Sequence, residues 1–147
     1  MEIRKVETDK KRYLDLLLLA DEQEDMVDRY LERGTMYVLE DDGVRAECVV
    51  TDEGNGILEL KNIAVEPDFQ GRGYGKALVE FLIRTYAGRY VTMQVGTGDS
   101  SSTIPFYEAC GFRRHHVVKN FFTDHYDHPI YEDGVQLVDM VYLQREL

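Results

Sequence analysis

A glycine-rich corner at residues 62–80, with the sequence NIAVEPDFQGRGYGKALVE, constrains the fold of this chain more than any other feature. The segment begins as an apolar strand end, passes through a short turn and the glycines, and continues with the pattern of a helix. Glycine lets the backbone approach a ligand closely, and the first N–H groups of a helix have no partner inside the helix. A strand that enters a helix through glycines is therefore a typical site for a bound anion.

Three phosphate-binding motifs compete for this corner. A P-loop is excluded, because Gln70 stands where its first glycine is required and Ala77 stands where it needs a hydroxyl. A dinucleotide fingerprint is excluded, because Lys76 replaces its third glycine. The third motif begins with Gln or Arg, which is followed by any two residues and a Gly. One further residue of any type then precedes a Gly or Ala. The sequence QGRGYG at 70–75 matches it in full.

The rest of the chain predicts an α/β fold with a mixed sheet of about six to seven strands and about four helices. We expect strands at residues 2–7, 35–40, 44–51, 57–65, 90–95, 112–119 and 136–143, and helices at residues 10–20, 25–32, 73–86 and 102–109. Asp9 and Ser102 are candidate N-caps, and Gly34 is a candidate helix stop. The helix at 73–86 should connect two parallel strands by a right-handed crossover. Residues 120–134 are expected to be irregular.

Composition narrows the class of protein. A length of 147 residues predicts a single domain over 1–147. The longest apolar run is too short to span a membrane, no signal peptide is evident, and two distant cysteines argue against a disulfide framework, so we expect a cytoplasmic protein without a membrane partner. A net charge of −11 argues against a nucleic-acid partner and favours a cationic or amine-bearing one, although excess carboxylates also serve solubility.

A second segment joins the corner in a family resemblance. Residues 106–112, FYEACGF, contain a tyrosine on the fourth helix and a glycine stop before the next strand. Together with the strand residues Ile63–Val65 and the QGRGYG corner, this segment resembles the acetyl-CoA-binding core of the GNAT superfamily of N-acetyltransferases. The resemblance covers nearly the whole chain, and it implies the GNAT fold with acetyl-CoA as the acyl donor.

The resemblance implies which residues bind the coenzyme. The pantetheine arm should enter a gap beside the strand at 57–65, with a backbone N–H at about Val65 as the oxyanion donor. The pyrophosphate should lie on the backbone of the corner, with polar side chains nearby. One departure is Ser100, which stands where many members have Asn. The expected coenzyme-binding residues are Ile63, Ala64, Val65, Gln70, Gly71, Arg72, Gly73, Tyr74, Gly75, Lys76 and Ser100.

The resemblance also suggests the acid and the base. Tyr107 matches the family's usual general acid, which donates a proton to the departing thiolate of CoA. Glu59 is a candidate base at an offset that some members use, and Asn62 is a candidate for holding a water molecule. Many members act without a strong base, by direct attack of the amine, so this alternative stays open.

The acceptor is the least constrained part of the function. His125 and His128 lie among acidic residues in the 120–134 segment, but their spacing matches no metal site, so we expect no metal. That segment is expected to be a wall of the acceptor site or a packed surface loop. We expect transfer of acetyl to a primary amine of a small, cationic molecule. A protein or peptide amine, an acyl-CoA-binding sensor without turnover, and a homodimer remain open.

Overall fold

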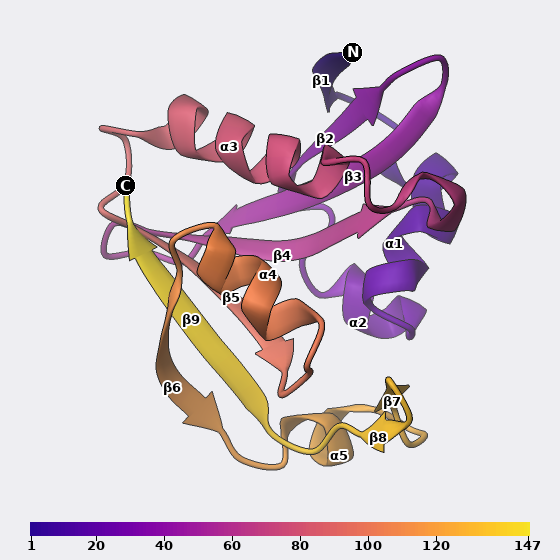
Figure 1. Ribbon diagram of the computed structural model, residues 1–147, viewed down its shortest axis with the longest axis vertical. Helices are drawn as coiled ribbons and strands as arrows, with labels where there is room; N and C mark the ends of the chain where they lie inside the picture. Colours follow the sequence, from indigo (N-terminus) through magenta and orange to yellow (C-terminus); the bar gives the residue numbers. More distant parts are fainter.

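The computed structural model describes residues 1–147, and a mixed seven-stranded sheet runs through its centre (Figure 1). The strand order is β1-β2-β3-β4-β5-β9-β6, in which only β4 and β5 are parallel neighbours. The strands are β1 (Glu2–Val6), β2 (Thr35–Glu40), β3 (Val44–Asp52), β4 (Ile57–Val65), β5 (Thr92–Gly98), β6 (Arg113–Val118) and β9 (Met140–Glu146). The expected mixed sheet of six to seven strands is confirmed.

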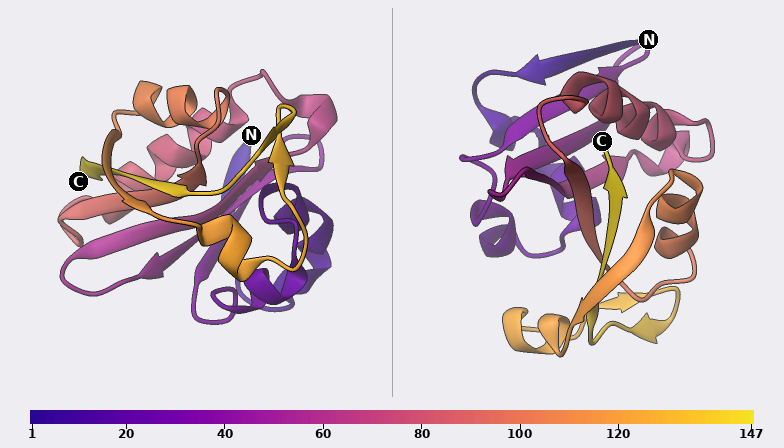
Figure 2. Two further views of the ribbon diagram at one scale, coloured as in Figure 1. Left: turned by 90° about the horizontal axis from the view of Figure 1, so that it is seen from below. Right: turned by 90° about the vertical axis from the view of Figure 1, so that its left-hand side faces the viewer.

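Five α-helices cover the two faces of the sheet. They are α1 (Leu14–Ala20), α2 (Glu24–Asp28), α3 (Tyr74–Tyr86), α4 (Thr103–Ala109) and α5 (Phe121–His125). The left panel of Figure 2 shows α3 and α4 on one face, and α1, α2 and α5 on the other. Short 3-10 helices precede α1 (Lys10–Tyr13) and follow β4 (Pro67–Phe69). None of the helices has the length and apolar character needed to cross a membrane.

Alternation of side chains along the strands builds a separate core on each face. In β2, Leu39 belongs to the larger core under α3 and α4, whereas its neighbour Val38 belongs to the core under α1 and α2. Helix α3 contributes Leu78 and Leu82 to the larger core at helical spacing, and both side chains are fully buried. Each face of the sheet is therefore covered by its own layer of helices.

The parallel pair at the centre of the sheet is short. Strand β4 pairs with β5 only from Ile57 to Leu60, although both strands continue further. An irregularity in the β3–β4 register leaves Lys61 without an opposite residue, which is the pattern of a β-bulge. Beyond this point the two strands diverge, as the family resemblance implied. Helix α3 makes the crossover between them.

The first helices differ from the sequence expectation. Asp9 does not cap a helix: its φ is 54°, its side chain makes no capping bond, and the α-helix begins only at Leu14. Helix α2 is shorter than expected and ends at Asp28. A glycine is required at position 34 because a larger residue would not fit: a Cβ there would lie 2.7 Å from Cγ1 of Val49. The backbone of Gly34 does not adopt the left-handed conformation.

The later strands are also shifted along the sequence. Residues 90–91 lie outside the strand, because the N–H groups of Val91 and Thr92 both donate to the carbonyl of Gly56. Strand β5 instead continues through Gly96 and Gly98, which sequence analysis placed in a loop. It continues because β9 pairs with it along its whole length. The final strand accordingly starts at 140 rather than 136.

The 120–134 segment is more ordered than expected. It contains α5 and the strand β7 (Tyr131–Glu132), which pairs with β8 (Val135–Gln136) as a small hairpin. Ser102 precedes α4 without a side-chain cap. The hydroxyl oxygen of Ser100 instead accepts from the N–H of Ser102 at 3.2 Å, and more weakly from that of Thr103 at 3.5 Å.

Candidate active site

The glycine corner leaves several backbone donors free at the start of α3. Gly71 and Gly73 have φ values of 78° and 86°, and no atom lies within 4 Å of a Cβ added at either position. Conformation rather than space therefore requires these glycines. The first intrahelical bond runs from the N–H of Ala77 to the carbonyl of Gly73, so the N–H groups before Ala77 are available to an anion.

Side chains beside the corner hold its shape. Gln70 donates from Nε2 to the carbonyl of Val65 at 3.2 Å, which ties the loop to the end of β4. The guanidinium groups of Arg45 and Arg72 both lie over the ring of Phe69, at 3.9 and 4.7 Å from its centroid. Two cations are thus held close to the free N–H groups by cation–π contacts.

Two further corner residues have neighbours of their own. The hydroxyl of Tyr74 donates to Asp41 in the β2–β3 turn, and its ring belongs to the larger core. Lys76 is exposed and lies 4.0 Å from Glu80, one turn further along α3. Tyr74 therefore offers the corner only its backbone N–H, whereas the side chain of Lys76 remains accessible to solvent and to an anion.

The exposed edge of β4 provides backbone donors at the divergence. The N–H of Glu66 donates to the carbonyl of Arg45 on β3. Alternate residues of a strand direct their N–H groups to opposite sides, so those of Ile63 and Val65 face β5 and that of Ala64 faces β3. Since β5 no longer pairs there, these two N–H groups remain free for an extended ligand.

A cavity of about 500 Å³ lies at this divergence. Its walls include Asn62 and Ile63 of β4, residues 95–98 of β5, and Tyr107 of α4. At its other end it reaches the last residues of α1 and the β7 hairpin. One continuous space therefore connects the gap between the strands with the loops expected to hold an acceptor.

Tyr107 is buried and keeps its proton. Its ring packs edge-on against Phe106 and Phe112. Burial raises the pKa of the Tyr107 hydroxyl well above its usual range, and the nearby Cys110 and Glu132 raise it further. No protein group forms a hydrogen bond with this hydroxyl. It is therefore a neutral donor that faces a cavity.

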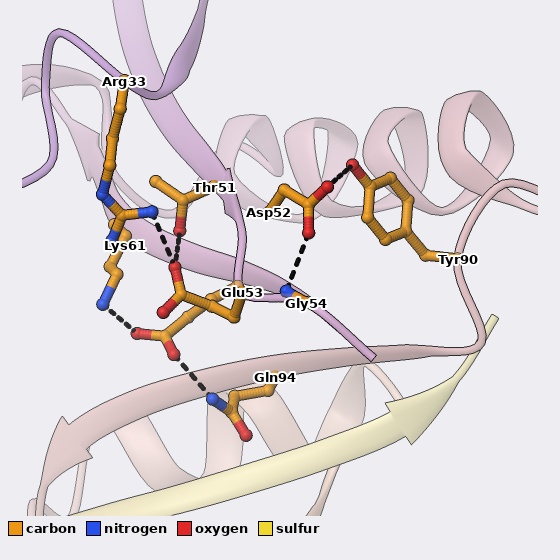
Figure 3. A network of polar contacts seen from close by, with 9 residues as sticks. Arg33, Thr51, Asp52, Glu53, Gly54, Lys61, Tyr90 and Gln94 are labelled. Carbon is orange, nitrogen blue, oxygen red and sulfur yellow. Dashed lines mark hydrogen bonds and ion pairs between the residues drawn. The ribbon is translucent and has the colours of Figure 1, made fainter. Parts of the chain in front are cut away.

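Glu59 lies on the opposite side of the divergence, in a second cavity of about 300 Å³. Glu59 is 5% exposed, and its two oxygens are engaged by the side chains of Gln94 and Lys61, which are labelled in Figure 3. Oε1 accepts from Nε2 of Gln94 at 2.6 Å, and Oε2 forms an ion pair with Nζ of Lys61 at 2.7 Å. The two cavities share Lys61, Gly96 and Asp21 among their walls.

Asn62 and Ser100 have roles in the framework. The amide of Asn62 donates to the carbonyl of Leu17 and to the hydroxyl of Tyr30, both at 3.0 Å, so it holds the first two helices against β4. Its carbonyl oxygen is buried without a partner. Ser100 is buried under the start of α4, as described above, and it does not line either cavity.

Several residues of the site were not singled out by the sequence. Asp21 accepts hydrogen bonds from Tyr30 and Tyr126, and it lines both cavities. Glu132 lines the first cavity, and Lys61 lines both. Asp21 and Glu132 come from segments 111 positions apart that carry no recognisable motif. Lys61 alone had a local signal in the sequence, because it stands two positions after Glu59 on the same strand. The β-bulge lies at this position.

No group of three or more metal-ligating side chains is present in the chain. His128 is exposed and pairs with Asp127 at 2.6 Å and with Glu22 at 3.8 Å. These carboxylates raise the pKa of the His128 imidazole above its ordinary value. His125 packs against the ring of Phe121. His128 therefore contributes to the packing of the 120–134 segment against the α1–α2 loop, whereas His125 packs within α5.

A family model described as an acetyltransferase (GNAT) domain matches residues 32–114. The chain belongs to the GNAT superfamily of acetyltransferases. It is 40% identical over 144 residues to the uncharacterized N-acetyltransferase YvbK of Bacillus subtilis, covering 96% of this chain and 92% of YvbK.

Solved structures agree with this membership. A GNAT family acetyltransferase from Elizabethkingia anophelis, with acetyl-CoA bound, superposes with a TM-score of 0.94 and 34% identity, covering 99% of this chain and 97% of that one. An acetyltransferase from B. subtilis in complex with CoA gives a TM-score of 0.90 and 38% identity, with the same coverage. The GNAT fold, the acetyltransferase activity and acetyl-CoA as donor are thereby confirmed.

Proposed function

We propose that this GNAT enzyme transfers acetyl from acetyl-CoA to a primary amine of a small cationic molecule. The observation that carries the proposal is that two cavities, one with Tyr107 and the other with Glu59, adjoin where β4 and β5 diverge. Charge favours a cation, because the larger cavity is lined by four carboxylates and by one lysine already paired with Glu59. The carboxylates are Asp21, Glu22, Glu132 and Asp133.

The coenzyme is proposed to lie along the diverging edge of β4. The free N–H groups of Ile63 and Val65 bind the pantetheine arm, and that of Val65 is the expected oxyanion donor, with Ala64 between them. The pyrophosphate lies at the start of α3 on the backbone of Gly71–Lys76. Arg72 and Lys76 contribute positive charge there, while Gln70 and Ser100 hold the loops on either side.

The proposed chemistry is direct attack of the neutral amine on the thioester carbonyl. The new C–N bond forms as the carbonyl π electrons move to oxygen, and the C–S bond then breaks. Glu59 accepts the proton that the nitrogen loses, through a water molecule, because each carboxylate oxygen keeps a second lone pair beside Gln94 and Lys61. Tyr107 donates to the sulfur as the thiolate leaves.

Two alternatives differ in the acceptor or in turnover. A protein or peptide amine would need an approach wide enough for a chain, whereas cavities of about 500 and 300 Å³ have the size typical of small-molecule sites. We therefore favour a small molecule. A sensor without turnover would have no use for a protonated Tyr107 facing the gap. We further propose that the chain acts as one cytoplasmic domain over 1–147, with a homodimer as its candidate assembly.

The experiment that tests the proposal measures thiol release from acetyl-CoA with a panel of small amines and a matched panel of peptides. We expect release and N-acetylated product with cationic small amines. Acetylation of peptides alone would refute the small-molecule acceptor. Binding of acetyl-CoA without release by any amine would favour the sensor.

A further inference from the structure

Asp21 occupies the point at which the two cavities meet. It is the first residue after α1, it is half-buried, and it lines both spaces. Tyr30 donates to its Oδ2 at 3.0 Å and Tyr126 donates to its Oδ1 at 2.6 Å. These tyrosines come from the turn after α2 and from the 120–134 segment, so three separate parts of the chain converge on one carboxylate.

No protein cation neutralises this carboxylate. Asp21 takes part in none of the ion pairs of the chain, and both of its hydrogen-bond donors are neutral hydroxyls. Burial raises the pKa of both hydroxyls well above the usual range, so each remains a donor. Burial also raises the pKa of Asp21, although Tyr126 and Tyr30 counteract this by stabilising the charged form.

Three cationic side chains line the second cavity together with Asp21, and none of them forms an ion pair with it. Lys61 pairs with Glu59, and Arg33 pairs with Glu53 at 3.0 Å. Arg29 contacts only the sulfur of Met26, and its side chain is exposed. A partly desolvated carboxylate without a cation is costly, and a ligand cation would offset that cost.

Asn62 supplies an independent sign of a missing donor. It is 3% exposed and lines the first cavity, and its Oδ1 has no hydrogen-bond partner. Its amide nitrogen is linked to Asp21 through the hydroxyl of Tyr30. A buried acceptor that lacks a donor calls for an N–H or O–H group from a ligand. An ammonium provides three such donors together with the charge that Asp21 lacks.

We propose that Asp21 is a specificity-determining residue that binds a second amino group of the acceptor in its protonated, ammonium form, with Oδ1 of Asn62 as the accompanying acceptor. The inference rests on the proposed function. The amine that is acetylated must attack as a neutral base, whereas a carboxylate at a separate position is best matched by a nitrogen that keeps its proton. The preferred acceptors are accordingly diamines, acetylated at one end and anchored at the other.

The test compares three acceptors that share a four-carbon chain: butylamine, 1,4-diaminobutane and 4-aminobutanoate. Thiol release gives kcat and KM for each. We expect kcat/KM to be at least about tenfold higher for the diamine than for butylamine. This is the gain in binding expected from one hydrogen bond between charged groups. In Asp21→Asn, KM for the diamine should rise by about 10- to 100-fold. The kcat/KM for the diamine divided by that for butylamine should then approach one.

Two further variants separate charge from structure. Asp15→Asn removes the same charge from an exposed position on α1 outside both cavities, and it should leave the diamine preference intact. Tyr126→Phe removes one hydroxyl but keeps the Asp21 carboxylate, so it should retain most of the preference. If Asp21→Asn and Tyr126→Phe lower the activity on both amines equally, Asp21 is only structural and the inference is overturned.

The remaining outcomes distinguish failure of the inference from failure of the proposed function. Equal acetylation of butylamine and diaminobutane by the native enzyme refutes the second ammonium site while the proposed function stands. A preference for 4-aminobutanoate also refutes it, and it would point to anion binding by Arg29 and Arg33. Binding of acetyl-CoA without acetylation of any of the three amines refutes the proposed function for this class, and the inference with it.

Discussion

At the scale of single residues, polar groups without protein partners line the cavity that is proposed to be the active site. The hydroxyl of Tyr107 faces a cavity without a hydrogen bond, and Oδ1 of Asn62 lacks a donor. Glu59 is the opposite case, because Gln94 and Lys61 engage both of its oxygens. A donor with a free hydroxyl is ready for a ligand, whereas a carboxylate held on both sides is already oriented before a ligand arrives.

Tyr107→Phe tests the proposed acid with minimal change in shape. The ring keeps its edge-on contacts with Phe106 and Phe112, so acetyl-CoA affinity should be unchanged in a titration. We expect kcat for thiol release to fall by about 100-fold, within the usual contribution of a general acid. Phe106→Leu, which changes a neighbouring ring but no hydroxyl, is the matched control. Full turnover in Tyr107→Phe would remove this residue from the mechanism.

At the scale of elements, the strand–corner–helix unit is the part proposed to bind the coenzyme. Its glycines serve different purposes. Gly71 and Gly73 adopt positive φ in open space, whereas Gly75 lies inside α3, where an added Cβ would meet Phe106 at 3.4 Å, an ordinary contact. The two kinds of glycine should therefore respond differently to the same substitution.

Gly73→Ala should destabilise the fold by about 1–2 kcal/mol, because alanine is strained in the left-handed conformation. It should also weaken acetyl-CoA binding, since any relaxation moves the first N–H groups of α3. Gly75→Ala should range from neutral to about 0.5 kcal/mol stabilising, because alanine favours the helix. Urea unfolding and acetyl-CoA titration measure both effects. Equal destabilisation by the two changes would contradict the conformational explanation.

At the scale of the whole molecule, a fully buried carboxyl group lies between the sheet and the layer of α1 and α2. Glu47 of β3 is fully buried, and neither of its oxygens has a partner. It lies opposite Val38 and Ala64 and shares the face of Val49. Desolvation raises the pKa of the Glu47 carboxyl well above its ordinary value, so the folded state holds this proton to a higher pH than the unfolded chain does.

Glu47 should make the whole fold less stable as the pH rises. The unfolded chain loses the Glu47 proton near its reference pKa of about 4.3, whereas the folded state retains it. From that pH up to the folded pKa, the unfolded state binds fewer protons, and stability falls by up to about 1.4 kcal/mol per pH unit. Glu47→Gln removes this titration. We expect the variant to be more stable than the native chain at pH 8 and equal to it near pH 4.

Chemical denaturation at several pH values measures this difference. Val49→Ala, a substitution on the same face of β3 that removes no titratable group and no hydrogen bond, is the control, and its effect should not depend on pH. A difference between Glu47→Gln and the native chain that is constant across the pH range would show that Glu47 does not titrate differently on folding.

Much of the fold was predictable because its signals are local. Strands β2 and β4 have the expected bounds, and α3 begins one residue after its expected start, since turns and helical periodicity are determined by neighbours in sequence. Strand β5 was placed too early, because Gly96 and Gly98 look like loop residues until β9 pairs with them. The cap of α4 was missed for a similar reason: Ser102 has the expected position, but Ser100 makes the bonds.

The sequence by itself determined the reaction class, because the QGRGYG corner and the Tyr107 segment are contiguous motifs whose backbone requirements are written in neighbouring residues. Only the tertiary structure brings together the residues that are proposed to bind the acceptor. Asp21, Tyr30 and Tyr126 meet because α1, α2 and the 120–134 segment pack together on one face of the sheet. No spacing in the chain encodes that meeting. It depends on the burial of apolar side chains far apart in sequence, which brings the polar groups with them.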